Sequence, residues 1–240
     1  MRGRFLSPVL GRLAPGCRGV TRKASVIAID GPAASGKSST AQMVAEKLDY
    51  LHVDSGSLYR AATAAILRRE KDPASWSEAS VLDAARDVEL RAARTSFYPA
   101  IDGRAIEDEI RGADVTRNVS RVAQMPRVRE WVNEKVRAAA VSRNVVVDGR
   151  DMGTVVFPKA DLKIFLVADS RERAARRLRQ RGTPTSQLLL DDETIRINER
   201  DARDARQTVP AADAVVIDTT SLTQGEQVEQ IVTLWEQRVG

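Results

Sequence analysis

The sequence predicts an α/β fold in three layers, with a five-stranded parallel sheet between two layers of helices. Five short apolar runs, rich in β-branched residues, read as buried strands at 25–30, 51–54, 144–148, 161–167 and 214–218. Helix-like segments separate them, and a strand that alternates with helices implies parallel pairing. With 240 residues, 42% of them hydrophobic, the chain can form one such domain with insertions.

The first strand leads into the motif that organises the chain. Gly31-Pro-Ala-Ala-Ser-Gly-Lys-Ser38 follows Ser25–Asp30 and matches G-x-x-x-x-G-K-[ST], and 38–48 then reads as a helix. A chance glycine-rich turn would not require that order of strand, loop and helix. The motif predicts a P-loop NTPase core that binds ATP phosphates through Gly31, Pro32, Ala33, Ala34, Ser35, Gly36, Lys37, Ser38 and Ser39.

The second strand and its helix, about 58–69, supply the next candidate residues. The strand contains the single histidine, His52, for which a metal role is improbable without partner ligands. The residues at its carboxyl end fall where open α/β sheets bind ligands. These are Asp54, Ser55, Tyr59 and Arg60; for the last two, an ordinary place on the helix surface is an equally good interpretation.

The segment from about 72 to 142 changes character and reads as an inserted subdomain. A short helix at 77–86 precedes a loosely alternating stretch, 88–101, with a turn at Asp102-Gly103. A longer helix follows at 126–141, with Val128, Trp131, Val132 and Val136 on one face. Arg129 on this helix is either a solvated charge or a cleft residue.

The third strand ends in Asp148-Gly-Arg150-Asp151. An aspartate at this place is the usual acidic partner of a phosphate-binding loop, so Ser38 and Asp148 are the predicted ligands of Mg²⁺. Two carboxylates and an arginine within four residues favour a functional over a structural interpretation.

An arginine-rich region follows the fourth strand. A helix from Ser170 carries six arginines, and Arg200–Arg206 is again densely charged. Such runs are normally solvated faces, but here they also suit a lid over phosphates, at about 178–209. After the fifth strand, Thr223 and Glu226 form a capping box for a last helix that ends near Arg238.

The positive charge is concentrated at one end of the chain. The net charge is +5, but residues 1–23 contain six basic and no acidic residues, which leaves 32 basic against 33 acidic, or −1, for the remainder. Nucleic acid is therefore not an expected partner. We treat 1–24 as an N-terminal extension, expected to be disordered: a transit peptide, a tail or a start codon set too far upstream. Its Cys17 is the only cysteine, which is typical of a reducing compartment.

The reaction class follows from what the chain contains and lacks. It has no Asn-Lys-x-Asp motif for guanine, and the body is not basic, so GTPases and nucleic-acid-driven ATPases are disfavoured. An insertion and a lid suit phosphoryl transfer to a small acceptor. A nucleotide-dependent regulatory protein and a kinase for a different small acceptor remain alternatives.

Several motifs in this order carry a resemblance. Gly31–Ser38, Val53-Asp-Ser-Gly-Ser-Leu-Tyr-Arg60, Pro126-Arg-Val-Arg129, Asp148-Gly-Arg-Asp-Met-Gly153 and Arg200-Asp-x-x-Asp204 together resemble the bacterial cytidylate kinases, from about residue 26 to 239. The resemblance implies ATP- and Mg²⁺-dependent phosphorylation of CMP and dCMP in the cytoplasm, by a domain spanning 25–240.

The same resemblance implies residue roles. Arg60 and Arg150 would hold the acceptor phosphate; Ser120, Arg129 and Asp151 would read cytosine; Arg200 and Asp204 would contact the ribose. Lys37, Arg150 and lid arginines, with Arg173, Arg176 and Arg177 expected, would stabilise the transferring group. Where the family has an arginine three residues after the second aspartate, this chain has Gln207, and the following connection is shorter. No apolar seam stands out on the surface, so a monomer is expected.

Overall fold

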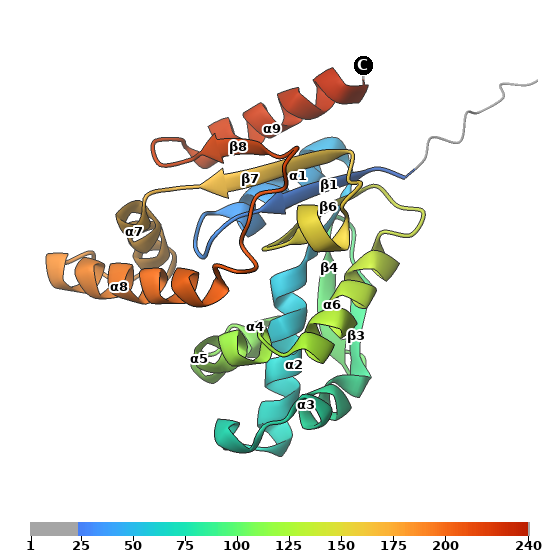
Figure 1. Cartoon of the computed structure of the whole chain (residues 1–240), viewed down its shortest axis with the longest axis vertical. Helices are drawn as coiled ribbons and strands as arrows, with labels where there is room; N and C mark the ends of the chain where they lie inside the picture. Colours follow the sequence, from blue (N-terminus) through green and yellow to red (C-terminus); the bar gives the residue numbers. More distant parts are fainter. Residues whose placement is uncertain (1–23, 240) are drawn as a thin grey trace, which may run out of the picture.

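The computed structural model describes residues 24–239, so the predictions for 1–23 lie outside the described residues. Its centre is a five-stranded parallel sheet with strand order β2-β6-β1-β7-β8 (Figure 1). The strands are β1 Val26–Asp30, β2 Leu51–Asp54, β6 Val145–Gly149, β7 Leu162–Val167 and β8 Val215–Asp218. The predicted α/β class and the five-stranded parallel sheet are confirmed.

Central strand β1 separates two apolar cores because successive side chains point to opposite faces. Ile27 and Ile29 are fully buried against α1 (Lys37–Leu48) and α9 (Gln224–Val239). Ala28 faces the other core, which α2 (Ser55–Arg69) covers. These contacts give the three predicted layers.

Helix α2 begins earlier than the predicted start near Leu58. The Asp54 carboxylate accepts a hydrogen bond from the Gly56 N–H at 2.8 Å and thereby caps the helix. The first turn of α2 is therefore continuous with the carboxyl end of β2, and the side chains of both elements have fixed positions relative to each other.

The segment between α2 and β6 has its own antiparallel sheet, of β3 (Val88–Ala92), β4 (Phe97–Ile101) and β5 (Arg104–Ala105). The predicted helices are present as α3 (Glu78–Ala84), which a short 3₁₀ turn extends, and α6 (Pro126–Ala139). Two further helices, α4 (Glu107–Ile110) and α5 (Ala113–Val122), have no counterpart in the predictions. All of these elements follow or pack on α2 (Figure 1).

Two helices, α7 (Ser170–Gln180) and α8 (Gln187–Asp204), pair beside the sheet (Figure 1). We call residues 170–207 the arm. Glu193 is buried on α8 and forms ion pairs with Arg177 Nε at 3.1 Å and with Arg181 Nη1 at 3.2 Å. Its carboxylate therefore joins the two helices. The predicted arginine-rich helix is confirmed, whereas α8 was not predicted as a helix.

None of the helices within 24–239 combines the length and the apolar character that crossing a membrane requires.

Candidate functional site

A cavity of about 940 Å³ opens at the carboxyl ends of β1, β2 and β6 and extends between α2, α6 and the arm. It brings together most of the residues predicted to bind nucleotides. These are Ala34, Gly36, Lys37, Ser38, Ser39, Asp54, Ser55, Tyr59, Arg60, Ser120, Arg129, Asp148, Arg150, Asp151, Arg177, Arg200 and Asp204. Gly31, Pro32, Ala33, Ser35 and Arg173 do not line it.

Two glycines shape the phosphate-binding loop. A Cβ on Gly31 would lie 2.4 Å from the Leu166 carbonyl oxygen, so only glycine lets the loop pass this close to β7. Gly36 has φ +85° directly before α1, a conformation that favours glycine. The N-terminus of α1 therefore opens into the cavity, where its N–H groups and dipole favour an anion.

Lys37 is the buried cation of the loop. Its Nζ donates to the Pro32 carbonyl at 3.2 Å, and its side chain is 8% exposed. Burial, with a further contribution from the charge of Arg150, lowers the pKa of Lys37 to about 7. An anion in the cavity would compensate both effects and hold the lysine in its charged form.

Ser38, Asp148 and His52 form a chain of hydrogen bonds below the loop. Ser38 Oγ donates to Asp148 Oδ2 at 2.5 Å, and His52 Nε2 lies 2.7 Å from Asp148 Oδ1. Burial alone would raise the pKa of Asp148, but the hydrogen bond and charge of His52 hold it below its ordinary value. Asp148 is therefore an ionised, oriented carboxylate beside the loop hydroxyl.

Asp30 fixes the turn that directly follows Arg150 and Asp151. Its two carboxylate oxygens accept the N–H groups of Met152 at 2.8 Å and Gly153 at 2.7 Å, in a single π-helical turn at Met152–Val156. Burial raises the pKa of Asp30 to about 6, although both N–H groups lower it. A residue of the loop strand thus sets the position of the polar residues that follow β6.

Four arginines converge on the cavity from α2, the end of β6 and the arm; we call Arg60, Arg150, Arg177 and Arg200 the arginine cluster. Burial, together with the charge of Arg150, lowers the pKa of Arg200 to about 10. Burial lowers the pKa of Arg60 as well, and the charges of Arg177 and Arg150 add to the effect. Asp204 offsets part of this charge, at 3.4 Å from Arg150 and 3.7 Å from Arg200. This concentration of cations suits a multiply charged anion.

A second group of side chains surrounds Arg129, and we call Tyr59, Arg129, Asp151 and Gln207 the Arg129 cluster. Arg129 Nη2 pairs with Asp151, Nη1 donates to Gln207 Oε1 at 2.7 Å, and the guanidinium lies 5.8 Å from the Tyr59 ring centroid. Tyr59 is buried, and its hydroxyl has no partner within residues 24–239. Arg129 and Tyr59 are therefore cavity residues, and neither is a helix-surface residue.

The remaining arm arginines make other contacts. Arg173 donates to the Ala33 carbonyl at 2.9 Å and to Asp201 Oδ2 at 2.5 Å, while Asp201 Oδ1 accepts the Ala33 N–H at 3.1 Å. Arg173 thus ties the arm to the back of the phosphate loop, outside the cavity. Arg176 lines the cavity and donates to the Thr219 hydroxyl at 3.1 Å.

Some site residues had no assigned function in the sequence. His52 and Asp30 act through Asp148 and the π-turn, and their position at strand ends was the available signal. Asp201 contacts Ala33 across 168 positions, a separation that no local pattern reveals. Ser55, which was predicted, donates to the Asp148 carbonyl at 2.8 Å and so also supports the end of β6.

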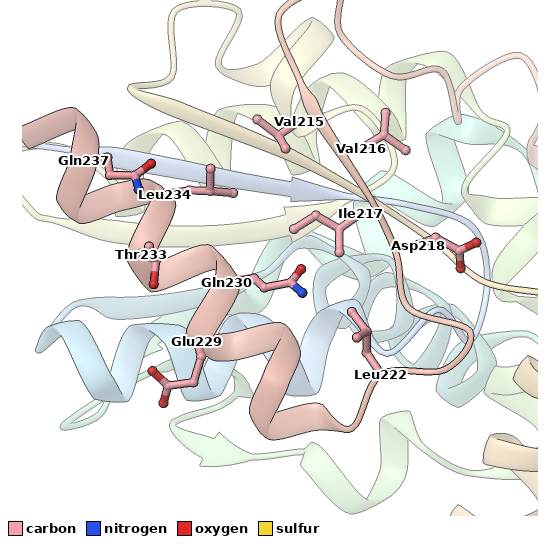
Figure 2. Close-up of a pocket in the computed structure, with 10 residues that line it drawn as sticks. All are labelled: Val215, Val216, Ile217, Asp218, Leu222, Glu229, Gln230, Thr233, Leu234 and Gln237. Carbon is pink, nitrogen blue, oxygen red and sulfur yellow. The ribbon is translucent and has the colours of Figure 1, made fainter.

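A second hollow lies between β8 and α9, with Val216, Ile217, Leu222 and Leu234 among its lining residues (Figure 2). Figure 2 shows mainly apolar and amide side chains there, with Asp218 and Glu229 at its margins. None of the predicted site residues lines it, so the nucleotide chemistry belongs to the larger cavity.

Known proteins similar to this chain agree on one family. The family model described as cytidylate kinase matches residues 27–237. A cytidylate kinase of Geobacillus kaustophilus is 43% identical, covering 89% of this chain and 97% of its own. One of Salinibacter ruber is 42% identical, with 86% and 95% covered, and one of Bordetella bronchiseptica is 44% identical, with 88% and 95% covered. With the phosphate-binding loop, the arginine cluster and the Arg129 cluster facing one cavity, the chain belongs to the cytidylate kinase family.

Proposed function

We propose that this protein transfers the γ-phosphoryl group of ATP to CMP or dCMP and releases ADP and the nucleoside diphosphate. The observation that carries the proposal is the convergence of the arginine cluster on the same cavity as the phosphate-binding loop. Two polyanions that must approach each other need this density of cations between them, because their mutual repulsion opposes the reaction.

On the donor side, the loop N–H groups and the N-terminus of α1 hold the ATP phosphates, and Lys37 reaches the outer ones. Burial lowers the pKa of Lys37 in the empty cavity, and the negative charge of bound phosphates would raise it again. The positive charge of Lys37 then lies next to the negative charge that develops on the phosphoryl group during transfer. Catalysis requires such stabilisation of the transition state.

Mg²⁺ fits the residues beside the loop. Ser38 Oγ and Asp148 Oδ2, 2.5 Å apart, are a hydroxyl and an ionised carboxylate, the hard oxygen donors that this ion prefers. Water and the ATP phosphates would supply the remaining oxygen ligands, as is usual for this ion. Bound there, Mg²⁺ would neutralise charge on the ATP phosphates.

On the acceptor side, Arg60 and Arg150 hold the α-phosphate of CMP, and Arg177 stabilises the group in transfer. Arg200 and Asp204 lie on α8 at the same end of the cavity and contact the ribose. Arg173 is less suited to its predicted catalytic role, because its guanidinium is occupied by Ala33 and Asp201. We assign it the positioning of the arm on the loop.

The Arg129 cluster reads the base, with Ser120 on the cavity wall nearby. Asp151 accepts hydrogen bonds through its carboxylate, which suits the exocyclic amino group of cytosine. Uracil would present a carbonyl oxygen to the same carboxylate. Two acceptors would then face each other without a hydrogen between them. The cluster therefore favours CMP over UMP.

We further propose that residues 25–240 form the kinase domain, that about 72–142 are the acceptor-binding subdomain, and that the arm contains the lid, about 178–209. The contacts of the arm with both the loop and Arg129 support the last assignment. Cytoplasmic location and a monomeric state also remain proposals.

The test is an assay of ADP formation from ATP and Mg²⁺ with CMP, dCMP, UMP, AMP or GMP, on wild type and Asp151→Asn. We expect CMP and dCMP to dominate, and the variant to lose roughly tenfold or more of the CMP to UMP preference, since its amide can donate to uracil. Asp114→Asn is the matched control, because the Asp114 carboxylate is exposed and pairs with the exposed Arg117. Equal turnover of all acceptors, or ATP binding without transfer to any, contradicts the proposal.

A further inference from the structure

Gln207 occupies the place where the family's pattern has an arginine, at the first turn beyond α8. Its N–H donates to the Asp204 carbonyl at 2.9 Å, which continues the helical path and turns the side chain toward the cavity. The end of the arm therefore presents a neutral amide to the cavity.

The amide is used for a contact that an arginine could not make. Gln207 Oε1 accepts from Arg129 Nη1 at 2.7 Å. A guanidinium has donors and no acceptor, and its charge would repel Arg129. Only residues with an oxygen acceptor at this reach can replace glutamine in this contact.

Gln207 completes a set of acceptors around one guanidinium. Arg129 Nη1 also donates to the Ala123 carbonyl at 3.1 Å, and Nη2 pairs with Asp151. The three acceptors lie in separate segments: Ala123 at the end of α5, Asp151 just before the π-turn, and Gln207 in the arm. The guanidinium plane is thereby fixed over Tyr59, with Asp151 held in place on the side where the base is read.

We propose that Gln207 is a positioning residue that couples recognition of the pyrimidine base to closure of the arm, which rests on the kinase function above. Arm opening removes one acceptor from Arg129, and a base that requires Arg129 and Asp151 in their paired geometry favours the closed arm. The two equilibria are linked, so each stabilises the other. Through this contact, closure of the arm responds to the base rather than to phosphate alone.

The proposal is tested with Gln207→Ala, Gln207→Glu and Gln207→Arg. We expect Gln207→Ala to raise the KM for CMP roughly tenfold, since the lost hydrogen bond involves a charged group, with a smaller rise for UMP and with kcat changed less than about threefold. Gln207→Glu keeps the acceptor and should restore most of the preference for CMP. Gln207→Arg should resemble Gln207→Ala or bind CMP more weakly.

Titration calorimetry of CMP without ATP gives a readout independent of turnover and should show the same order of affinities. Gln187→Ala, at the exposed start of α8, is the control, because within residues 24–239 this side chain hydrogen-bonds only to Asp191. The inference is overturned if Gln207→Ala leaves the CMP to UMP ratio unchanged, if it lowers kcat alone, or if Gln207→Arg binds CMP more tightly than wild type. Failure of the kinase function would differ, because wild type itself would then phosphorylate no acceptor.

Discussion

The phosphate-binding loop and the Arg129 cluster face one cavity but are built in different ways. The loop brings Ala34, Gly36, Lys37, Ser38 and Ser39, all from one short run of the chain, to the cavity. The Arg129 cluster takes side chains from four separate segments, between Tyr59 and Gln207. In the function proposed above, the loop binds a chemical group that all nucleotides share, whereas the cluster recognises one base. Changes in the loop should therefore alter the rate, and changes in the cluster should alter the choice of acceptor.

The largest effect is expected from Lys37→Ala. Loss of the buried cation should lower kcat by roughly 10²–10³-fold with every acceptor, because the charge is used most in the transition state. The CMP to UMP ratio should stay within about threefold of wild type, and an assay of ADP formation with both acceptors measures it. Lys47→Ala, at the exposed end of α1, should change neither value. A selective loss of CMP activity in Lys37→Ala would break the division between loop and cluster.

The pKa of Lys37 gives this prediction a second measurement. An unfolded lysine titrates near pH 10.4, and the folded one near 7. Between these values the unfolded chain binds one more proton, so the free energy of unfolding rises with pH. Denaturant titrations from pH 7 to 9 without nucleotide should show a shallower rise in Lys37→Ala than in wild type. Identical slopes would mean that Lys37 stays charged in the empty cavity.

Asp30→Asn should give an intermediate effect, because Asp30 lies on the loop strand and supports the turn of the acceptor side. An amide has one acceptor oxygen for two N–H groups, so one of them, Met152 or Gly153, loses its partner. We expect a loss of about 1–3 kcal/mol in the free energy of unfolding. The KM for CMP should rise more than the KM for ATP, as Arg150 and Asp151 move.

Asp161→Asn is the control for Asp30→Asn, because Asp161 accepts the Val26 N–H at 2.8 Å at the opposite end of β1. Asparagine keeps one acceptor oxygen for this single N–H, so the variant should lower stability less than Asp30→Asn and change neither KM. If both variants affect the acceptor KM equally, the π-turn has no special dependence on Asp30.

The smallest effect is expected from Asp201→Ala, which releases the arm from the loop. The variant loses the contacts of Asp201 with the Ala33 N–H and with Arg173. Hydrogen exchange of α8 without nucleotide should accelerate, while kcat should change by less than about tenfold, because ATP phosphates take over the free N–H. Exposed Asp192→Ala on the same helix is the control. Unchanged exchange would show that the contacts of Asp201 do not hold the arm against the loop.

The fold and the loop could be predicted because their signals are local. Each core strand is a short apolar run, and the loop motif stands directly after one of them. Helix α5 also had such a signal, since Val115, Val119 and Val122 are spaced for one face and all are buried. Helix α8 did not, because its buried residues include Glu193 and Asp204, which are held by arginines.

The contacts inside the cavity could not be predicted from local sequence patterns, because they join residues that lie far apart in the chain. Motifs placed Arg129, Asp151 and Arg150 near the acceptor, but the contact of Gln207 with Arg129 joins residues 78 positions apart. Gln207 was conspicuous only as a departure from a pattern. Its partner, and the different use of Arg173, depend on how the arm folds onto the sheet, which charge patterns do not specify.

The strand order has a consequence for how the chain is made. The central strand β1 pairs with β6 and β7, and β2 pairs only with β6, so neither early strand has a partner within the sheet until residue 145 has emerged. At about 5–20 residues per second, a ribosome needs roughly 6–24 s to synthesise the chain from β1 to β6. During that interval the apolar strand and the glycine-rich loop stand exposed on the nascent chain. The phosphate-binding loop, whose motif stands near the start of the sequence, therefore cannot reach its place in the sheet until more than half of the chain has been synthesised.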